Sequence, residues 1–520
     1  MNGTKKLLEY CQTDRQKTVI KAVIKYGSNQ KAAEAINTNR RCVDKIVARV
    51  KAKAENPDNH NPQRVVEKKT IAPSAGYVVT SAQNDTPVHA KFLASMLRYC
   101  KAKNYQLIVI PTHYKNPSAF GSSQGYEWAD DVKPYLLSDD FKPCKNLRIM
   151  GSIKIQPTAT RPLSSLDTIS GCDSAIFGHP KVALRSIATQ SNRMAKLIYT
   201  TGSITKKHYS DSKIGRKGDF HHVMGAIVVE VAGDKFHARN IAAQGDGSFI
   251  DLDYKWSATG REKIKSVPVI TLGDLHAEDV SESALACYYE VRKTLKPKRL
   301  VLHDVLNFGS ASYHNTFFER FEKFHTGRDD VRNEVELTCA LMDDLAAGVE
   351  ELVMVASNHN DHFTKWLEAE KNCNDLRNAR IFAETRAYYL KEWEEGRRPV
   401  SPLAYWASQW CKNFHKMRFL DRDEGYSVNG VELSYHGDKG PGGARGSTMN
   451  LAKIGAKVTK GHDHKAEIID GCYSAGTFSI LNPSYTRGSP SAWINSMVVQ
   501  YQNGKRTHIN SIGGEWRGGK

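Results

Sequence analysis

The sequence predicts an α/β protein with a small all-α domain at the N-terminus and a mixed α/β domain in the middle. Three observations support this prediction. The 520 residues are too many for one ordinary hydrophobic core. The first 54 residues repeat a helical apolar pattern, and from about residue 263 strand-like apolar runs alternate with amphipathic helices. We expect domains at 1–54, 77–262 and 263–520, with a linker at 55–76.

The composition excludes several classes of protein. Hydrophobic residues make up 40% and charged residues 25%, which is typical of a globular chain. No apolar run reaches the length of about 18 residues that a membrane span needs, and the N-terminus lacks the apolar core of a secretory signal. We therefore expect a cytoplasmic protein. The ten cysteines include no C-x-x-C pair, which argues against both a disulfide framework and a thiolate zinc site.

The charge is concentrated at the N-terminus. The whole chain has a net charge of +18. Residues 1–54 contain nine Lys and four Arg against four acidic residues, so half of the excess charge lies in about a tenth of the chain. Such a local excess of positive charge indicates a polyanionic partner.

The basic segment has the pattern of three short helices. Residues 14–26 place Val19, Ile20, Val23 and Ile24 at helical spacing, and Ser28 can cap a second helix, NQKAAEAI. A third helix over 40–54 repeats the apolar face. This arrangement resembles the helix-turn-helix family, which implies that Arg40, Arg41 and Lys45 face DNA. The alternative is a basic three-helix bundle that docks on a protein or only solubilises the N-terminus.

The middle segment, 77–262, has no motif that indicates a function. It begins with an apolar run, an amphipathic helix and a second apolar run, which is typical of a β-α-β unit. The pair His221 and His222 is expected to be structural or exposed rather than metal-binding.

Polar clusters follow five apolar runs in the last 250 residues. Because open α/β folds build their sites at the carboxyl ends of strands, these side chains are expected to meet there. They are Asp274 and His276, then Asp304, then Asn358 and His359, then His436, and finally His462 and His464.

Carboxylate, imidazole and amide ligands without a thiolate suit manganese, iron or zinc in a hydrolytic site. Seven candidate ligands are too many for one ion. They are the right number for two ions that share a bridging carboxylate, the arrangement used in phosphoryl transfer.

The ordered series D-x-H, Asp, N-H, His and G-H-x-H resembles the calcineurin-like metallophosphoesterase superfamily over about 250 residues. The resemblance implies a β-sandwich flanked by helices and two metal ions, with a preference for Mn²⁺ over zinc. The implied ligand sets share Asp304. The first metal would be bound by Asp274, His276, Asp304 and His464, and the second by Asp304, Asn358, His436 and His462.

His359 is the catalytic residue that the resemblance implies. In the family the histidine at this position is not a metal ligand, and it would act as general acid or stabilise the transition state. The sequence departs from the family nearby. His303 replaces a glycine before Asp304, Asn307 is an amide, and Ser357 and Asn360 flank Asn358-His359. These departures concern how His359 is oriented and how the substrate phosphate is held.

The expected substrate is DNA. Asn307 and Ser312 resemble part of a motif of the DNA-end-processing nucleases of the superfamily, although Ala311 replaces its proline. The chain is also similar to phage-encoded members associated with DNA transfer and breakdown of host DNA, which would place it in the host cytoplasm. Lys439 and Arg445, in a glycine-rich loop, are candidate contacts to the DNA backbone, or solvated charges.

The prediction is thus a two-metal phosphodiesterase acting as a DNase, and the sequence leaves open whether the chain forms a homo-oligomer. The alternatives are a phosphatase or small-molecule phosphodiesterase, and a DNA-binding or virion-associated protein with a non-catalytic scaffold.

Overall fold

The computed structural model describes residues 7–11, 14–55, 71–114, 127–190, 193–483 and 486–518. The chain divides into two compact units. The first comprises Met1–Lys68 with Pro117–Glu127, and the second comprises Lys69–Asn116 with Trp128–Lys520. The expected linker, 55–76, lies mostly outside the described residues, and the expected boundary at 262 falls within the second unit.

The N-terminal unit contains the three predicted helices, preceded by a short 3-10 turn. Val19, Ile20, Ala33 and Val43 are among the residues buried between them. The Ser28 hydroxyl accepts a hydrogen bond from the Lys31 amide, so this predicted cap is confirmed. The elements are η1 (Leu7–Tyr10), α2 (Asp14–Tyr26), α3 (Asn29–Ala35) and α4 (Arg40–Glu55).

The second unit begins with a four-stranded sheet in the order β2-β1-β8-β9. β1 and β2 are parallel and joined by helix α5, which confirms the predicted β-α-β unit. β8 and β9 are antiparallel to each other. The bounds are β1 (Gly76–Gln83), α5 (Ala90–Lys103), β2 (Gln106–Thr112), β8 (Gly225–Ala232) and β9 (Lys235–Ala242). A small antiparallel sheet follows, made of β10 (Phe249–Asp251), β11 (Tyr254–Trp256) and β12 (Arg261–Lys263).

A six-stranded sheet positions the candidate site. Its order is β16-β15-β14-β13-β22-β23, in which β13 to β16 are parallel and β22 and β23 antiparallel. The bounds are β13 (Val269–Leu272), β14 (Arg299–Leu302), β15 (Glu351–Met354), β16 (Met417–Phe419), β22 (Ser496–Gln500) and β23 (Arg506–Asn510).

Both faces of this sheet are buried, as expected for parallel strands. Alternate residues such as Leu300 and Leu302 pack in the core that includes the neighbouring helices, whereas Val301 packs on the opposite face. There it meets Val431 and Leu433, in and just after strand β18 (Val431–Glu432). Because successive side chains of a strand point to opposite faces of the sheet, the apolar run of β14 contributes to two cores.

A ten-stranded sheet joins the middle of the sequence to its C-terminal part. Strand β6 pairs with β20, with Arg185 opposite Glu467. The strand order is β17-β18-β19-β21-β20-β6-β7-β5-β4-β3. The bounds are β3 (Asp140–Cys144), β4 (Leu147–Met150), β5 (Ser174–Phe177), β6 (Leu184–Ile187), β7 (Lys196–Thr200), β17 (Ser427–Val428), β18 (Val431–Glu432), β19 (Lys457–Lys460), β20 (Ala466–Ile469) and β21 (Cys472–Ala475).

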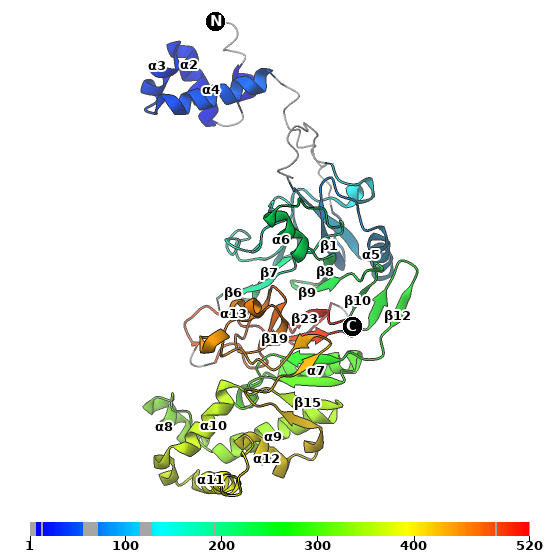
Figure 1. The fold of residues 1–520 in the computed structure, drawn as a ribbon. Coiled ribbons are helices and arrows are strands. Elements are labelled where there is room, and N and C mark those ends of the chain that lie inside the picture. Colours follow the sequence, from blue (N-terminus) through cyan, green and yellow to red (C-terminus); the bar gives the residue numbers. More distant parts are fainter. Residues whose placement is uncertain are drawn as a thin grey trace. The chain divides into compact units, whose positions relative to one another are not determined.

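The remaining helices of the second unit include a group, α8 to α12, at the end away from β1 (Figure 1). Among the described residues, no helix is both long and apolar enough to cross a bilayer. The α-helices are α6 (Lys213–His221), α7 (Glu282–Leu295), α8 (Phe317–Thr326), α9 (Val331–Ala347), α10 (Asn358–Glu368), α11 (Ala379–Glu394), α12 (Pro402–Trp410) and α13 (Thr448–Leu451). The 3-10 turns are η3 (Asp130–Tyr135), η4 (Ala277–Asp279), η5 (Glu370–Asn374), η6 (Phe414–Lys416), η7 (Pro441–Gly443) and η8 (Ala452–Ile454).

Candidate metal centre

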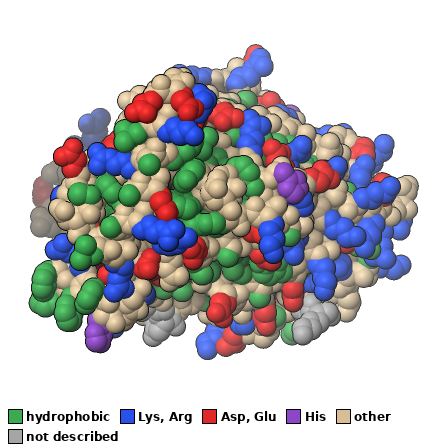
Figure 2. Space-filling model, turned by 90° about the horizontal axis from the view of Figure 1, so that it is seen from below, with side chains coloured by type: hydrophobic (Ala, Val, Ile, Leu, Met, Phe, Trp, Pro, Cys, Tyr) green, Lys and Arg blue, Asp and Glu red, His purple; other side chains and the backbone are tan. Residues whose placement is uncertain are grey.

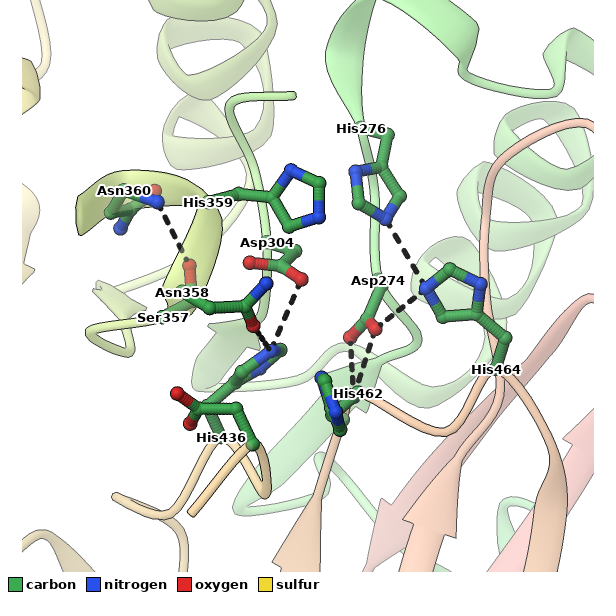
Figure 3. A network of polar contacts seen from close by, with 12 residues as sticks. Asp274, His276, Asp304, Ser357, Asn358, His359, Asn360, His436, His462 and His464 are labelled. Carbon is green, nitrogen blue, oxygen red and sulfur yellow. Dashed lines mark hydrogen bonds and ion pairs between the residues drawn. The ribbon is translucent and has the colours of Figure 1, made fainter. Parts of the chain in front are cut away.

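Polar side chains follow three neighbouring parallel strands. Asp274 lies two residues after β13, Asp304 two residues after β14, and Asn358 begins the helix that follows β15. Because the carboxyl ends of parallel strands share one edge of the sheet, the three side chains converge. His436 follows β18, and His462 and His464 follow β19, so both sheets contribute to the cluster (Figure 3).

One group of ligand atoms forms around Asp274. The Nε2 atom of His464 lies 3.0 Å from the Asp274 Oδ2 atom and 3.2 Å from the Nε2 atom of His276. The ligand atoms of these three buried residues all lie within 4.8 Å of one another, a spacing at which they could hold one metal ion.

A second group forms around His436. Its Nε2 atom lies 3.1 Å from the Asp304 Oδ2 atom and 3.1 Å from the Asn358 Oδ1 atom. Asp304, His436 and His462 bring their ligand atoms within 4.8 Å of one another. Asp304 also groups with His276 and His359, so this carboxylate lies between the two sets. His462 and His464 flank Asp463 in the sequence, and their side chains belong to different groups.

The backbone is unusual at four of the seven proposed ligands. They have positive φ angles, of 45° at His276, 40° at Asp304, 72° at His462 and 54° at His464. Non-glycine residues rarely adopt this conformation, and where they do it often belongs to a functional site. The surrounding structure must hold these residues in place.

Gly461 allows the His462–His464 loop to approach Asp274. A Cβ atom at this glycine would lie 2.2 Å from the Asp274 Oδ1 atom, which is closer than atoms can come. The close approach lets the His462 amide donate to the Asp274 carboxylate, with distances of 3.0 and 2.8 Å to its two oxygens. This contact is the physical reason for the glycine in the G-H-x-H motif.

Both central carboxylates are held in their ionised form. Burial alone would raise the pKa of Asp274, but the hydrogen bond from His464 and the nearby His436 bring it below the ordinary value. Burial opposes ionisation of Asp304 in the same way, yet His436 and His359 lower its pKa well below the ordinary range. The Asp304 Oδ1 atom is buried and has no hydrogen-bond partner among the described residues.

Two of the proposed ligand imidazoles are held neutral. Burial, reinforced by neighbouring imidazoles, lowers the pKa of His276 to about 3 and also lowers that of His462. At His436, in contrast, the Asp304 carboxylate outweighs burial and raises the pKa. Neutral imidazoles beside ionised carboxylates are the protonation states that metal ligation requires.

His359 is oriented by a contact that the sequence did not reveal. Its Nδ1 atom lies 2.8 Å from the main-chain oxygen of Asn307, which can only accept, so Nδ1 carries a proton. The side chain of Asn307 in turn donates to Asp279 at 3.1 Å. The ring centroids of His359 and His276 are 4.8 Å apart. Asn307 thus fixes the ring and leaves Nε2 available to the cluster.

His303 and Lys460 are buried beside the cluster and were not assigned a role from the sequence. His303 has both ring nitrogens without a hydrogen-bond partner among the described residues. Burial lowers its pKa to about 3, with a further contribution from His436. The Lys460 ammonium lies 2.8 Å from the Asp463 carboxylate and donates to the Gly461 carbonyl, so it stabilises the loop that carries His462 and His464. The position of His303 directly before Asp304 was the one feature of the sequence that could have indicated its place beside the cluster.

An arginine connects the helix of His359 to the loop of His436. The two Nη atoms of Arg422 each lie 2.8 Å from a carboxylate oxygen, one on Asp361 and the other on Asp438. Ser357 caps the same helix by accepting from the Asn360 amide. Asp361, three residues after Asn358, therefore has a structural partner in Arg422.

The proposed DNA contacts all lie at the surface. Arg40, Arg41 and Lys45 are exposed on the first turns of α4, and Arg40 forms an exposed ion pair with Asp44 at 3.6 Å. Lys439 and Arg445 are exposed in the loop after His436, where their backbones pair across a hairpin. These residues do not join the cluster, and their contact with DNA stays a prediction.

Fold and site together define an α/β protein with buried His and Asp groups that could hold a metal ion. The chain is similar to "Protein A1" of Escherichia phage T5, with 28% identity over 475 residues that cover 87% of this chain and 84% of the phage protein. A phage origin is compatible with this similarity. No protein-family model and no solved structure matches the chain.

Proposed function

We propose that this protein is a phosphodiesterase that hydrolyses the DNA backbone with two divalent metal ions, of the calcineurin-like metallophosphoesterase class. The observation that carries the proposal is the pair of ligand groups that share Asp304 at the carboxyl edge of a parallel sheet. The layered packing of the six-stranded sheet between helices and β18 is compatible with the sandwich of that class.

The residues present fit two cations. Two buried carboxylates face only imidazole, amide and backbone groups among the described residues, and the buried Asp304 Oδ1 atom has no hydrogen-bond partner. Asp274, His276 and His464 would hold one ion, and Asn358, His436 and His462 the other, with Asp304 between them. Carboxylate, imidazole and amide ligands suit manganese, iron or zinc, and of these we propose Mn²⁺.

When bound, such cations polarise phosphate oxygens and neutralise the charge that develops during displacement. The chain itself supplies the proton. In its doubly protonated form, with the Nδ1 proton donated to the Asn307 carbonyl, His359 can give the Nε2 proton to the leaving oxygen of the scissile bond. Burial of the cluster limits water and strengthens these electrostatic interactions.

DNA is the substrate that the charge distribution favours. The first 54 residues have a net charge of +9, and the α4 residues Arg40, Arg41 and Lys45 are exposed. The loop that follows His436 adds exposed Lys439 and Arg445 on the side of the cluster formed by that histidine. Such contacts to phosphate give affinity without sequence information.

The test is incubation of the full chain with linear and closed-circular duplex DNA and single-stranded DNA, in Mn²⁺, Mg²⁺, Zn²⁺ or EDTA. We expect cleavage with Mn²⁺ and none with EDTA. His359→Ala should slow cleavage by about 10²- to 10⁴-fold, the usual contribution of a general acid. Exposed His415 provides the matched control, His415→Ala, which should cleave as wild type does.

A chromogenic phosphodiester separates the other functions. Turnover of that diester with every DNA left intact would replace the nuclease by a small-molecule phosphodiesterase. Tight DNA binding without turnover of any ester would leave a DNA-binding scaffold. Nicking of the closed circle would establish endonuclease action.

A further inference from the structure

A groove of about 810 Å³ lies beside the candidate metal centre. The loop after Phe308 lines it together with parts of α8, α10 and η5. None of its residues belongs to the proposed ligand sets. The groove is therefore a second feature of this face, next to the chemistry but distinct from it.

Aromatic rings connect the groove to the cluster. The ring centroid of His362, in the groove, is 5.1 Å from that of His359 and 5.3 Å from that of Tyr313. Tyr313 in turn lies 4.0 Å from His314. Tyr313 is 66% exposed, so the series of rings runs from the buried site to an accessible aromatic face.

The groove has an excess of unpaired positive charge. Its acidic residues are already engaged, because Asp329 lies 2.6 Å from an Arg377 nitrogen and Asp375 accepts a hydrogen bond from the Asn378 side chain at 2.7 Å. Its three cations, in contrast, form no ion pair within the part of the chain that the structure describes. They are Arg320, Lys365 and Lys371.

Helix α8 extends this surface with further aromatic groups. It buries none of its residues, and Phe317, Phe318, Phe321 and Phe324 are each at least 60% exposed. Arg320 and Lys323 lie between them along the helix. Its two glutamates are engaged, Glu319 by the Thr316 backbone amide and Glu322 by Arg328. Figure 2 looks onto this end of the molecule, where hydrophobic side chains gather at one margin close to Lys and Arg side chains. Alternating aromatic and cationic groups are typical of surfaces that bind unpaired nucleotides.

We propose that the groove binds a single DNA strand next to the candidate metal centre, with unpaired bases stacked on Tyr313 and the backbone along Arg320, Lys365 and Lys371. The inference rests on the proposed function and narrows its substrate to single-stranded or frayed DNA. A single strand is required because the bases of an intact duplex stack on one another and do not offer their faces to a protein ring.

Binding of a labelled single-stranded oligonucleotide and of a duplex, followed by fluorescence anisotropy in EDTA, tests the groove independently of cleavage. Tyr313→Ala should weaken single-strand binding by roughly 5- to 100-fold, the usual effect of removing one stacking ring. Lys365→Ala and Lys371→Ala should each reduce the slope of log affinity against log salt by about 0.7, because each removes one phosphate contact.

Two exposed residues outside the groove provide matched controls. Trp393→Ala removes an aromatic ring from α11 that is 62% exposed, and Lys412→Ala removes an exposed cation. Both should bind the oligonucleotide as wild type does. Thermal unfolding of every variant checks that a loss of binding does not reflect a loss of folding.

The outcomes separate this inference from the proposed function. If wild type cleaves DNA and the groove variants bind the single strand as the controls do, the groove inference is wrong and the nuclease stands. If wild type cleaves no DNA but the groove variants lose single-strand binding, the groove stands and the nuclease fails. If sedimentation shows that Tyr313→Ala disrupts a dimer without altering single-strand affinity, the surface serves self-association and the inference is overturned.

Discussion

Two buried polar clusters in the same unit differ in how their charges are balanced. Around Arg239, the guanidinium Nη2 atom lies 2.6 Å from a Glu230 oxygen and 2.8 Å from an Asp251 oxygen, and the Tyr99 hydroxyl donates to the same carboxylate of Asp251. In the candidate metal centre no lysine or arginine contacts Asp274 or Asp304 among the described residues.

The difference distinguishes a structural network from a functional site. A fixed cation stabilises two buried carboxylates permanently, so the Arg239 cluster requires nothing from solution. Among the described residues no lysine or arginine provides such a cation to Asp274 or Asp304, and burying two carboxylates without a fixed cation costs free energy unless a cation binds. We read the first cluster as part of the fold and the second as a site shaped for a ligand.

The largest expected effect comes from removing the shared carboxylate. Asp304→Asn should reduce phosphodiester cleavage by on the order of 10³-fold or more, because it weakens both proposed ion sites. In wild type, Mn²⁺ at about 100 times its Kd should add about 2.7 kcal/mol to the free energy of unfolding, and Asp304→Asn should lose this gain. Calorimetry with Mn²⁺ or EDTA measures it, with the exposed Asp423→Asn as control. If the free energy of unfolding of wild type is the same in Mn²⁺ and in EDTA, the cluster around Asp304 is not a metal site.

Breaking the structural cluster should affect folding instead. Arg239→Met leaves Glu230 and Asp251 buried without their cation, and we expect a loss of about 3–5 kcal/mol in the free energy of unfolding. Urea unfolding in EDTA gives the value. Mn²⁺ should still stabilise the folded variant as it does wild type. A loss below about 1 kcal/mol would show that the Arg239 network is not the structural element we describe.

Acid should destabilise the Arg239 cluster. Burial acts to raise the pKa of Asp251, but Arg239 overcomes it and holds the pKa below the ordinary value. A depressed pKa in the folded state contributes stability that is present above the unfolded value of about 3.9 and is lost as pH falls through the folded pKa. Unfolding free energy measured in EDTA should therefore decline below about pH 5, and more steeply than in Asp251→Asn. Parallel pH curves for the two proteins would rule out this contribution.

The smallest effects are expected at the exposed charges of the N-terminal unit. Arg40→Ala, Arg41→Ala and Lys45→Ala should each reduce the salt slope of duplex binding by about 0.9, without a change in thermal unfolding. Lys293→Ala, an exposed substitution on α7, is the matched control. Unchanged slopes in all three variants would favour the alternative of a basic bundle that does not contact DNA.

Local pattern was sufficient for the elements that deliver the site. Strands β13, β14 and β15 were recognisable as apolar runs, and the polar residues after them could be expected at one sheet edge. The three N-terminal helices were predicted from a 3.6-residue period and the Ser28 cap. Helix α8 was not predicted, although Phe317, Phe321 and Phe324 lie at helical spacing and Thr316 and Glu319 form a capping box.

By itself the sequence determined the strands, the helices that follow them and the kinds of ligand atom at their ends, because these depend on neighbours in the chain. Only the tertiary structure decided that the Asn307 carbonyl orients His359 and that the His462 amide donates to the Asp274 carboxylate. The same holds for the pairing of Arg185 with Glu467 in one sheet. Such contacts join residues far apart in the chain and depend on close packing and positive φ angles, which no local periodicity encodes.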